Sequence, residues 1–136
     1  MASIRKVGYY SMKVSNRPGA GAKMLDALKL AGVNLLAFTG FPERGGAQVD
    51  FVPQKEVAFR RAARKAGLKL SPRKTVFLMQ GADRPGALTG ALDKLAKARI
   101  NLTALDAVTA GKGRFGAIFW VRKQQVARAA RLLGAR

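Results

Sequence analysis

Hydrophobic and polar positions follow two patterns that appear in the same order in each half of the chain. Apolar, β-rich segments at 7–14 and 75–80 predict strands. Behind each strand, apolar residues recur at helical spacing from Gly21 to Ala31 and from Leu88 to Ala98, which predicts two helices. Each half continues with two strands joined by a Gly-containing hairpin turn and then a second helix: strands 33–41 and 47–52 with helix 54–66, and strands 100–108 and 114–121 with helix 123–133.

The two halves are copies of one unit. The segment Asn16–Ala20 (NRPGA) recurs as Asp83–Ala87 (DRPGA), an offset of 67 residues from position 16 to position 83. The same offset places Val33-Asn34-Leu35 on Ile100-Asn101-Leu102, and Arg61-Ala62-Ala63-Arg64 on Arg128-Ala129-Ala130-Arg131. One offset kept over several separate segments indicates an internal duplication.

The order of elements in each copy, β-α-β-β-α-β, predicts an α+β protein of two tandem ferredoxin-like modules with antiparallel sheets. We expect module 1 to span residues 1–71 and module 2 residues 72–136, with a boundary near Ser71-Pro72-Arg73. Leu68–Leu70 could form a short fourth strand in module 1. Module 2 reaches Arg136 directly after its last helix, so it lacks a full fourth strand, and its sheet edge is expected to be short or covered.

Modules this small bury little surface alone, so we expect them to share a sheet edge or face. The strand 114–121 carries Phe115 and Phe119 on one face and Ile118 and Trp120 on the other. Helices can cover only one of these faces. The sequence therefore predicts a homodimer or a larger homo-oligomer.

The absence of two residue types limits the chemistry of the chain. With no Cys and no His, it can form neither a disulfide nor a thiolate metal site, and it lacks the commonest general base. Only 7 carboxylates are available, and no two of them have a suggestive spacing. We therefore expect no catalytic residues, no metal site and no cofactor.

The charge is strongly basic, with 26 Lys and Arg against 7 Asp and Glu and a formal net charge of +19. Such a field attracts acidic protein partners or nucleic acid, although the cations are spread along the chain without forming a single block. The first residues lack the apolar core of a signal peptide, and no uncharged run is long enough to span a bilayer. The expected location is the cytoplasm, without membrane association.

The repeated loop has features of a carboxylate site. Pro18 and Pro85 suit the first turn of a helix, and Asn16 and Asp83 can initiate that turn. A glycine follows each proline and leaves backbone N–H groups accessible at the helix N-terminus, where a carboxylate is favoured. The alternative interpretation is a plain turn before a well-capped helix.

These loops resemble those of the ACT domain family. The resemblance rests on Asp83–Leu88, a following helix and Arg99–Leu102, with a degenerate copy from Asn16 to Leu35. It implies a non-catalytic regulatory protein that binds an amino acid where the first loop of one module meets the second strand of its neighbour. Asp83 would hold the ammonium group and the Gly86–Leu88 amides the carboxylate. The implied ligand-binding residues are Asn16, Gly19, Ala20, Asn34, Asp83, Gly86, Ala87, Leu88 and Asn101. Gly21 stands where the second copy has Leu88, so the two loops are not equivalent.

Two other functions are compatible with the same element order. An RRM-like protein would bind RNA on aromatic side chains of its sheet, and Phe115 and Phe119 follow a basic, Gly-containing segment at 112–114. The simpler interpretation of Phe115, Phe119 and Trp120 is a core or dimer interface. A ligand-free scaffold that docks on a partner enzyme is the third possibility.

Overall fold

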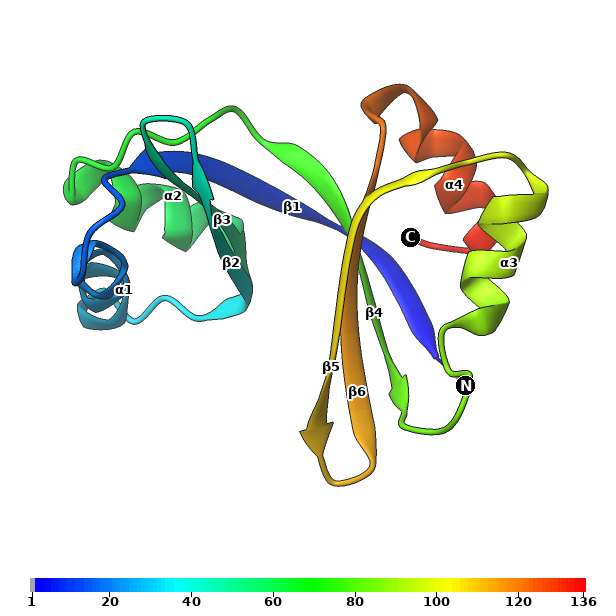
Figure 1. Ribbon diagram of the computed structural model, residues 1–136. Coiled ribbons are helices and arrows are strands. Elements are labelled where there is room, and N and C mark those ends of the chain that lie inside the picture. Colours follow the sequence, from blue (N-terminus) through cyan, green and yellow to red (C-terminus); the bar gives the residue numbers. More distant parts are fainter. Residues whose placement is uncertain (1) are drawn as a thin grey trace. The chain divides into compact units, whose positions relative to one another are not determined.

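The computed structural model describes residues 2–136, and these form an α+β structure (Figure 1). Its contacts group into an N-terminal unit, Gly8–Lys74, and a C-terminal unit, which combines Thr75–Arg136 with residues 2–7. Within the described residues, the elements in chain order are β1 (Ser3–Val14), α1 (Ala20–Leu30), β2 (Leu35–Glu43), β3 (Gly46–Pro53), α2 (Glu56–Lys65), β4 (Lys74–Ala82), α3 (Thr89–Lys97), β5 (Leu102–Gly111), β6 (Arg114–Val121), the 3-10 turn η1 (Lys123–Gln125) and α4 (Val126–Leu133).

In the N-terminal unit, β3 pairs antiparallel with both β1 and β2. Alternate residues of the strands face the two helices, because successive side chains of a strand point to opposite faces. Tyr10 and Phe51, which are register partners, both contact Phe59 of α2 with ring centroids 5.3 Å apart. Met24 and Leu28 complete this core from α1. The apolar side chains that recur every second residue in the strands therefore pack against those that recur at helical spacing in the helices, and together they form one core.

The C-terminal unit repeats this arrangement, with β6 antiparallel to both β4 and β5. Helices α3 and α4 lie on one side of these strands in Figure 1. Phe77 and Phe119, which are register partners, stack at 5.2 Å in the core, and Leu95 packs there from α3. Ala129 and Ala130 of α4 are buried in the same cluster, where their small side chains allow the helix to approach the sheet closely.

Residues 3–7 lie at the sheet edge that was expected to lack a fourth strand. Strand β1 begins at Ser3, earlier than predicted, and it is the hydrogen-bonded neighbour of β4. Ile4 packs against the core of the C-terminal unit, and the Lys6 N–H donates to the carbonyl of Arg136 at 3.0 Å. Residues 3–7 thus cover the edge of the sheet in the C-terminal unit, which was expected to be either short or covered.

Leu68–Leu70 does not form a strand, so this part of the prediction is wrong. Both leucines pack against the core of the N-terminal unit. Beyond them, the Ser71 N–H donates to the Ser11 carbonyl at 2.8 Å, and the Ser11 N–H donates to the hydroxyl of Ser71 at 2.9 Å. A side-chain oxygen here replaces a backbone acceptor, and the following Pro72 has no N–H to continue a ladder.

Within residues 2–136, no helix is long and apolar enough to cross a lipid bilayer.

Candidate functional site

The second repeated loop, Asp83–Leu88, connects β4 to α3 and is fixed by backbone hydrogen bonds. The Asp83 N–H donates to the carbonyl of Gly113 at 2.8 Å, which holds the loop against the β5–β6 hairpin. Gly86 has a φ of 74°, a left-handed conformation that favours glycine. The Thr89 N–H donates to the Gly86 carbonyl at 3.0 Å and closes the turn that leads into α3.

Two of the three amides expected to bind a carboxylate are available. The Ala87 N–H is used, because it donates to the carbonyl of Arg84 at 3.2 Å. No carbonyl in the described chain accepts a hydrogen bond from the N–H of Gly86 or Leu88. Unpaired N–H groups at the start of a helix form a partial positive charge, which favours an anion.

These groups border a cavity of about 330 Å³. Asp83, Gly86, Ala87 and Leu88, all predicted from the sequence, contribute to its lining. Val108 and Thr109 of β5 and Phe115 of β6 also line it, and the sequence analysis did not identify them as site residues. The Gly-Lys-Gly hairpin turn was the available signal, because it places the ends of β5 and β6 beside the β4–α3 loop.

Asn101 does not lie near Asp83 within the unit. The strand register pairs Ala82 and Gly111 with Arg114 at one end of the sheet, and Leu102 with Val121 at the other. Asp83 follows Ala82, whereas Asn101 precedes Leu102, so the two residues lie at opposite ends. A ligand held by the Asp83 loop is out of reach of the Asn101 side chain of the same unit.

The first repeated loop borders a larger cavity, of about 620 Å³. Of the four residues predicted to bind a ligand here, Gly19 and Ala20 line this cavity, whereas Asn16 and Asn34 do not. Asn34 instead ties the start of β2 to the segment after β3, because its carbonyl accepts a hydrogen bond from the Gln54 N–H at 3.0 Å. Three cations stand around this cavity without any carboxylate among its lining residues: Lys13, Arg17 and Lys23.

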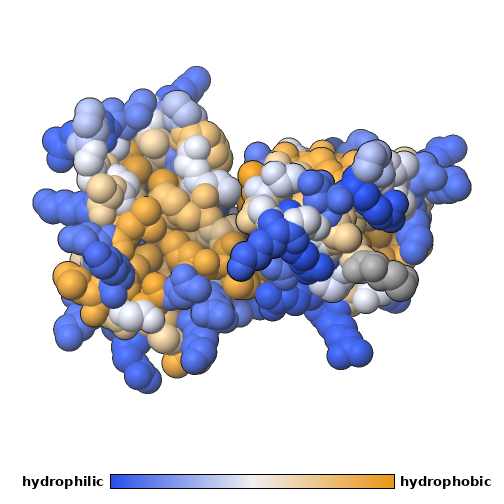
Figure 2. Space-filling view, turned by 90° about the horizontal axis from the view of Figure 1, so that it is seen from below, coloured by the Kyte–Doolittle hydropathy of each residue, from blue (hydrophilic) through white to orange (hydrophobic). Residues whose placement is uncertain are grey.

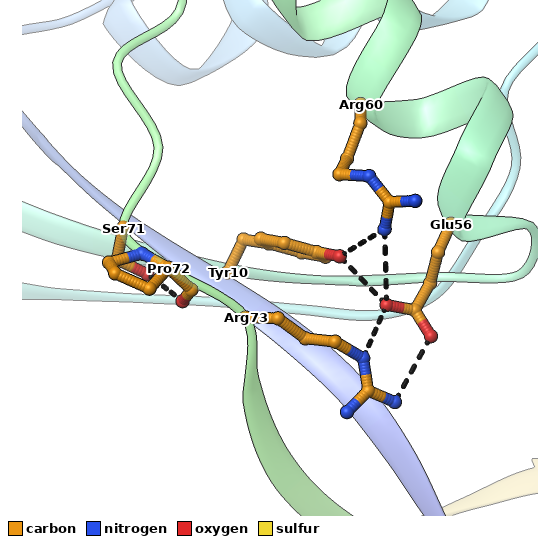
Figure 3. Close-up of polar contacts among 6 residues, drawn as sticks. All are labelled: Tyr10, Glu56, Arg60, Ser71, Pro72 and Arg73. Carbon is orange, nitrogen blue, oxygen red and sulfur yellow. Dashed lines mark hydrogen bonds and ion pairs between the residues drawn. The ribbon is translucent and has the colours of Figure 1, made fainter.

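A polar cluster in the N-terminal unit was not predicted (Figure 3). The hydroxyl of Tyr10 donates to Oε1 of Glu56 at 2.7 Å and accepts from Nη1 of Arg60 at 2.7 Å. Arg73 donates to both oxygens of Glu56, at 2.7 Å and 3.2 Å. The Arg73 hydrogen bond is the main reason why the pKa of Glu56 lies below its ordinary value, and burial is the main reason why the pKa of Tyr10 is raised. Glu56 stands in an otherwise basic segment, which was the only sequence signal for this cluster.

Phe115 and Phe119 of β6 do not form an RNA-binding platform. Phe115 and Phe119 lie in the core beneath the helices, together with Phe77 of β4. Bases stack on exposed aromatic faces, and these faces are covered by α3 and α4. The interpretation of Phe115 and Phe119 as core residues is confirmed, and the RRM-like alternative loses the residues on which it depended.

Comparison with solved structures identifies proteins that share this fold. A protein from Bacteroides thetaiotaomicron superposes with a TM-score of 0.77 at 14% identity, covering 98% of this chain and 88% of that one. The regulatory subunits of aspartate kinase from Thermus thermophilus and Thermus flavus superpose with TM-scores of 0.62 at 14% and 15% identity, covering 98% of this chain and 94% of theirs. At this identity the likeness establishes the fold alone; the neighbours include ACT-type regulatory domains, the family that the repeated loops resemble.

No family model matches the sequence, and no curated protein is similar to it.

Proposed function

We propose that this chain is a non-catalytic regulatory protein of the ACT type that binds a small amino acid at the Asp83–Leu88 loop. The observation that carries the proposal is the pairing of opposite binding groups in one cavity. The carboxylate of Asp83 offers an acceptor for an ammonium group, while the Gly86 and Leu88 amides offer donors for a carboxylate. These are the two charged groups that every free amino acid presents.

The first loop is the weaker candidate for the same ligand. Its cavity is larger, but its lining provides three cations and no acceptor for an ammonium group. Asn16, which stands where the second copy has Asp83, does not reach the cavity. We therefore keep Gly19 and Ala20 as candidate contacts and rank the second loop above the first.

The comparisons support a regulatory role. The aspartate kinase neighbours are regulatory subunits, and this chain spans almost their full length. A regulatory module of this kind would act on a catalytic partner, with the amino acid changing the affinity of that contact. If no ligand binds, docking on a partner enzyme without a ligand is the scaffold alternative.

We also propose that the two copies of the repeat are tandem ACT-like modules, divided near Ser71 except that residues 2–7 complete the second one, and assembled as a homo-oligomer. Strand β5 supports the assembly, because it is the outer strand of the C-terminal unit and is exposed over most of its length. Leu105 and Val108 on β5 and Phe41 on β2 are large apolar side chains left exposed. Figure 2 shows apolar areas open on the face in view. A second copy would cover such areas and could bring an asparagine equivalent to Asn34 or Asn101 to the Asp83 loop.

A thermal-shift screen with the amino acids tests the function, because a ligand that binds only the folded state raises its melting temperature. We expect one or a few amino acids to raise the melting temperature of the intact protein in a concentration-dependent way. A screen in which no amino acid shifts melting would contradict amino-acid binding.

A further inference from the structure

We infer that the second helix of each unit binds the phosphate backbone of double-stranded nucleic acid through a basic face. The basic face of the N-terminal unit is defined by Lys55, Arg61, Arg64 and Lys69, on α2 and its flanks. The basic face of the C-terminal unit is defined by Arg122, Arg128, Arg131 and Arg136, on α4 and its flanks. All eight side chains belong to exposed residues.

The basic positions follow the internal repeat. Each of the four cations of the first face corresponds to a cation of the second at the same 67-residue offset that relates Asn16 to Asp83. The first helices behave differently: Lys23 corresponds to Gly90, and Lys29 corresponds to Ala96. Two further cations of α2, Arg60 and Lys65, fall on Ala127 and Leu132, so the match is confined to the four positions of the basic face. Both copies therefore share this face as a feature of the unit.

Packing directs the arginines of each face outward. On α2, Phe59, Ala62 and Ala63 are buried against the core, and with 3.6 residues per turn Arg61 and Arg64 fall on the opposite side. On α4, the buried Ala129 and Ala130 leave Arg128 and Arg131 on the solvent side in the same way. The helix presents one side to the core and a pair of guanidinium groups, one turn apart, to the exterior.

Among residues 2–136, no carboxylate forms an ion pair with these cations. Among the described residues, ion pairs with carboxylates involve Arg60, Arg73 and Lys97, and none of these belongs to either basic face. Glu56, which lies on α2, is already held by Arg73 and Tyr10, as Figure 3 shows. With a sequence pI of about 11.6, the charge of each face is available to an external polyanion.

The surroundings of the cations favour a nucleic acid duplex over the other polyanions. Protein interfaces need an apolar or aromatic centre, whereas each of these described helices exposes a single large apolar side chain, Val57 on α2 and Leu132 on α4. Single strands are held by stacking on exposed aromatic side chains, but Phe59 is buried and α4 has no aromatic residue. Cations with one exposed apolar side chain per helix and no exposed aromatic one suit contacts to backbone phosphates, which carry no sequence preference.

The test is fluorescence anisotropy on the intact protein with labelled DNA duplexes of mixed sequence, measured from low to high salt. Each phosphate contact contributes about −0.9 to the slope of log affinity against log salt for a duplex. We expect the quadruple variant Arg61→Gln, Arg64→Gln, Arg128→Gln, Arg131→Gln to reduce the magnitude of that slope by about 2 to 4 and to bind at least about tenfold more weakly at low salt.

The matched control removes four exposed cations that lie on neither basic face: Lys29→Gln, Arg44→Gln, Lys94→Gln and Lys112→Gln. We expect its slope to stay within about 1 of the wild-type value, with both variants folded by circular dichroism. Equal losses in the two variants would overturn the inference, because binding would then follow net charge alone. Tighter binding of a single strand, or of poly-L-glutamate at the same salt, would also overturn it and point to a different class of partner.

Discussion

Arg73 and Glu56 form a two-point contact in which the guanidinium Nε and Nη2 lie 2.7 Å and 3.2 Å from the two carboxylate oxygens. Arg73 belongs to the segment that leads from α2 into β4, so this contact ties that segment to the start of the helix. Gly8 makes the approach possible, because a Cβ at this position would lie 2.5 Å from Oε1 of Glu56 and 2.6 Å from Nε of Arg73.

Replacing Glu56 with Gln should destabilise the fold by about 1–2 kcal/mol, because three charge-assisted or hydroxyl contacts meet on that carboxylate. Chemical denaturation measures the change. Asp93→Asn is the control, because the Asp93–Lys97 pair is exposed and worth no more than about 0.5 kcal/mol. A Glu56→Gln loss no larger than that of Asp93→Asn would show that the cluster does not stabilise the fold.

Glu56 also predicts a pH dependence. Its pKa is lowered in the folded protein from an ordinary value of 4.5, chiefly by Arg73. A carboxyl with a depressed folded pKa contributes stability that is present above the unfolded pKa and is lost as the pH falls through the folded one. As the pH falls below about 5, wild type should therefore lose more stability than Glu56→Gln. The difference should be about 1–2 kcal/mol, the energy expected for the contacts of Glu56. Parallel pH profiles of the two proteins would contradict this assignment.

Gly46→Ala should destabilise the protein, because the new Cβ would collide with the backbone carbonyl of Val14. Backbone cannot move aside cheaply in a paired strand, and overpacking of this kind costs about 1–3 kcal/mol. Gly40→Ala is the matched control on β2, where the nearest atom is a Val49 methyl group at an ordinary 3.5 Å. Thermal unfolding should separate the two variants, and equal melting temperatures would show that β1 and β3 are less closely packed at Gly46 than described.

Ile4→Ala should destabilise the C-terminal unit, although Ile4 stands at the start of the chain. Its side chain packs against the core that contains Phe77 and Phe119. Loss of a partly buried isoleucine costs about 1–2 kcal/mol, somewhat less than in a full core position. Val57→Ala, at an exposed apolar position, should change stability by less than about 0.5 kcal/mol. Hydrogen exchange that leaves β4 and β6 unaffected in Ile4→Ala would contradict the placement of residues 3–7.

The internal repeat and the two hydrophobic periods were enough to predict almost every helix and strand. They could not place residues 3–7, because the pairing of β1 with β4 joins segments about 70 residues apart and leaves no local pattern. They also suggested a strand at Leu68–Leu70, because the two leucines indicate burial. In the structure, the Ser11 N–H donates to the hydroxyl of Ser71 where a paired strand would offer a backbone carbonyl.

The candidate site was predicted in part for a similar reason. Asp83 and Gly86 belong to the local motif Asp83–Ala87, which could be recognised in the sequence, and both line the same cavity. Thr109 and Phe115 join that cavity only through strand register. Asn34 and Asn101 follow the first helices in sequence, but the register carries Asn101 to the far end of the sheet from Asp83.

The central claim is that the carboxylate of Asp83 holds the ammonium group of an amino acid, and calorimetric titration of Asp83→Ala tests it most directly. The amino acid that shifts melting is titrated into wild type, Asp83→Ala and Asn16→Ala, each confirmed as folded by circular dichroism. Loss of one charge-assisted hydrogen bond, about 1.5–3 kcal/mol, predicts an affinity about 10- to 150-fold weaker in Asp83→Ala and nearly unchanged in Asn16→Ala. Unchanged affinity in Asp83→Ala, or abolished binding in Asn16→Ala, would contradict the account.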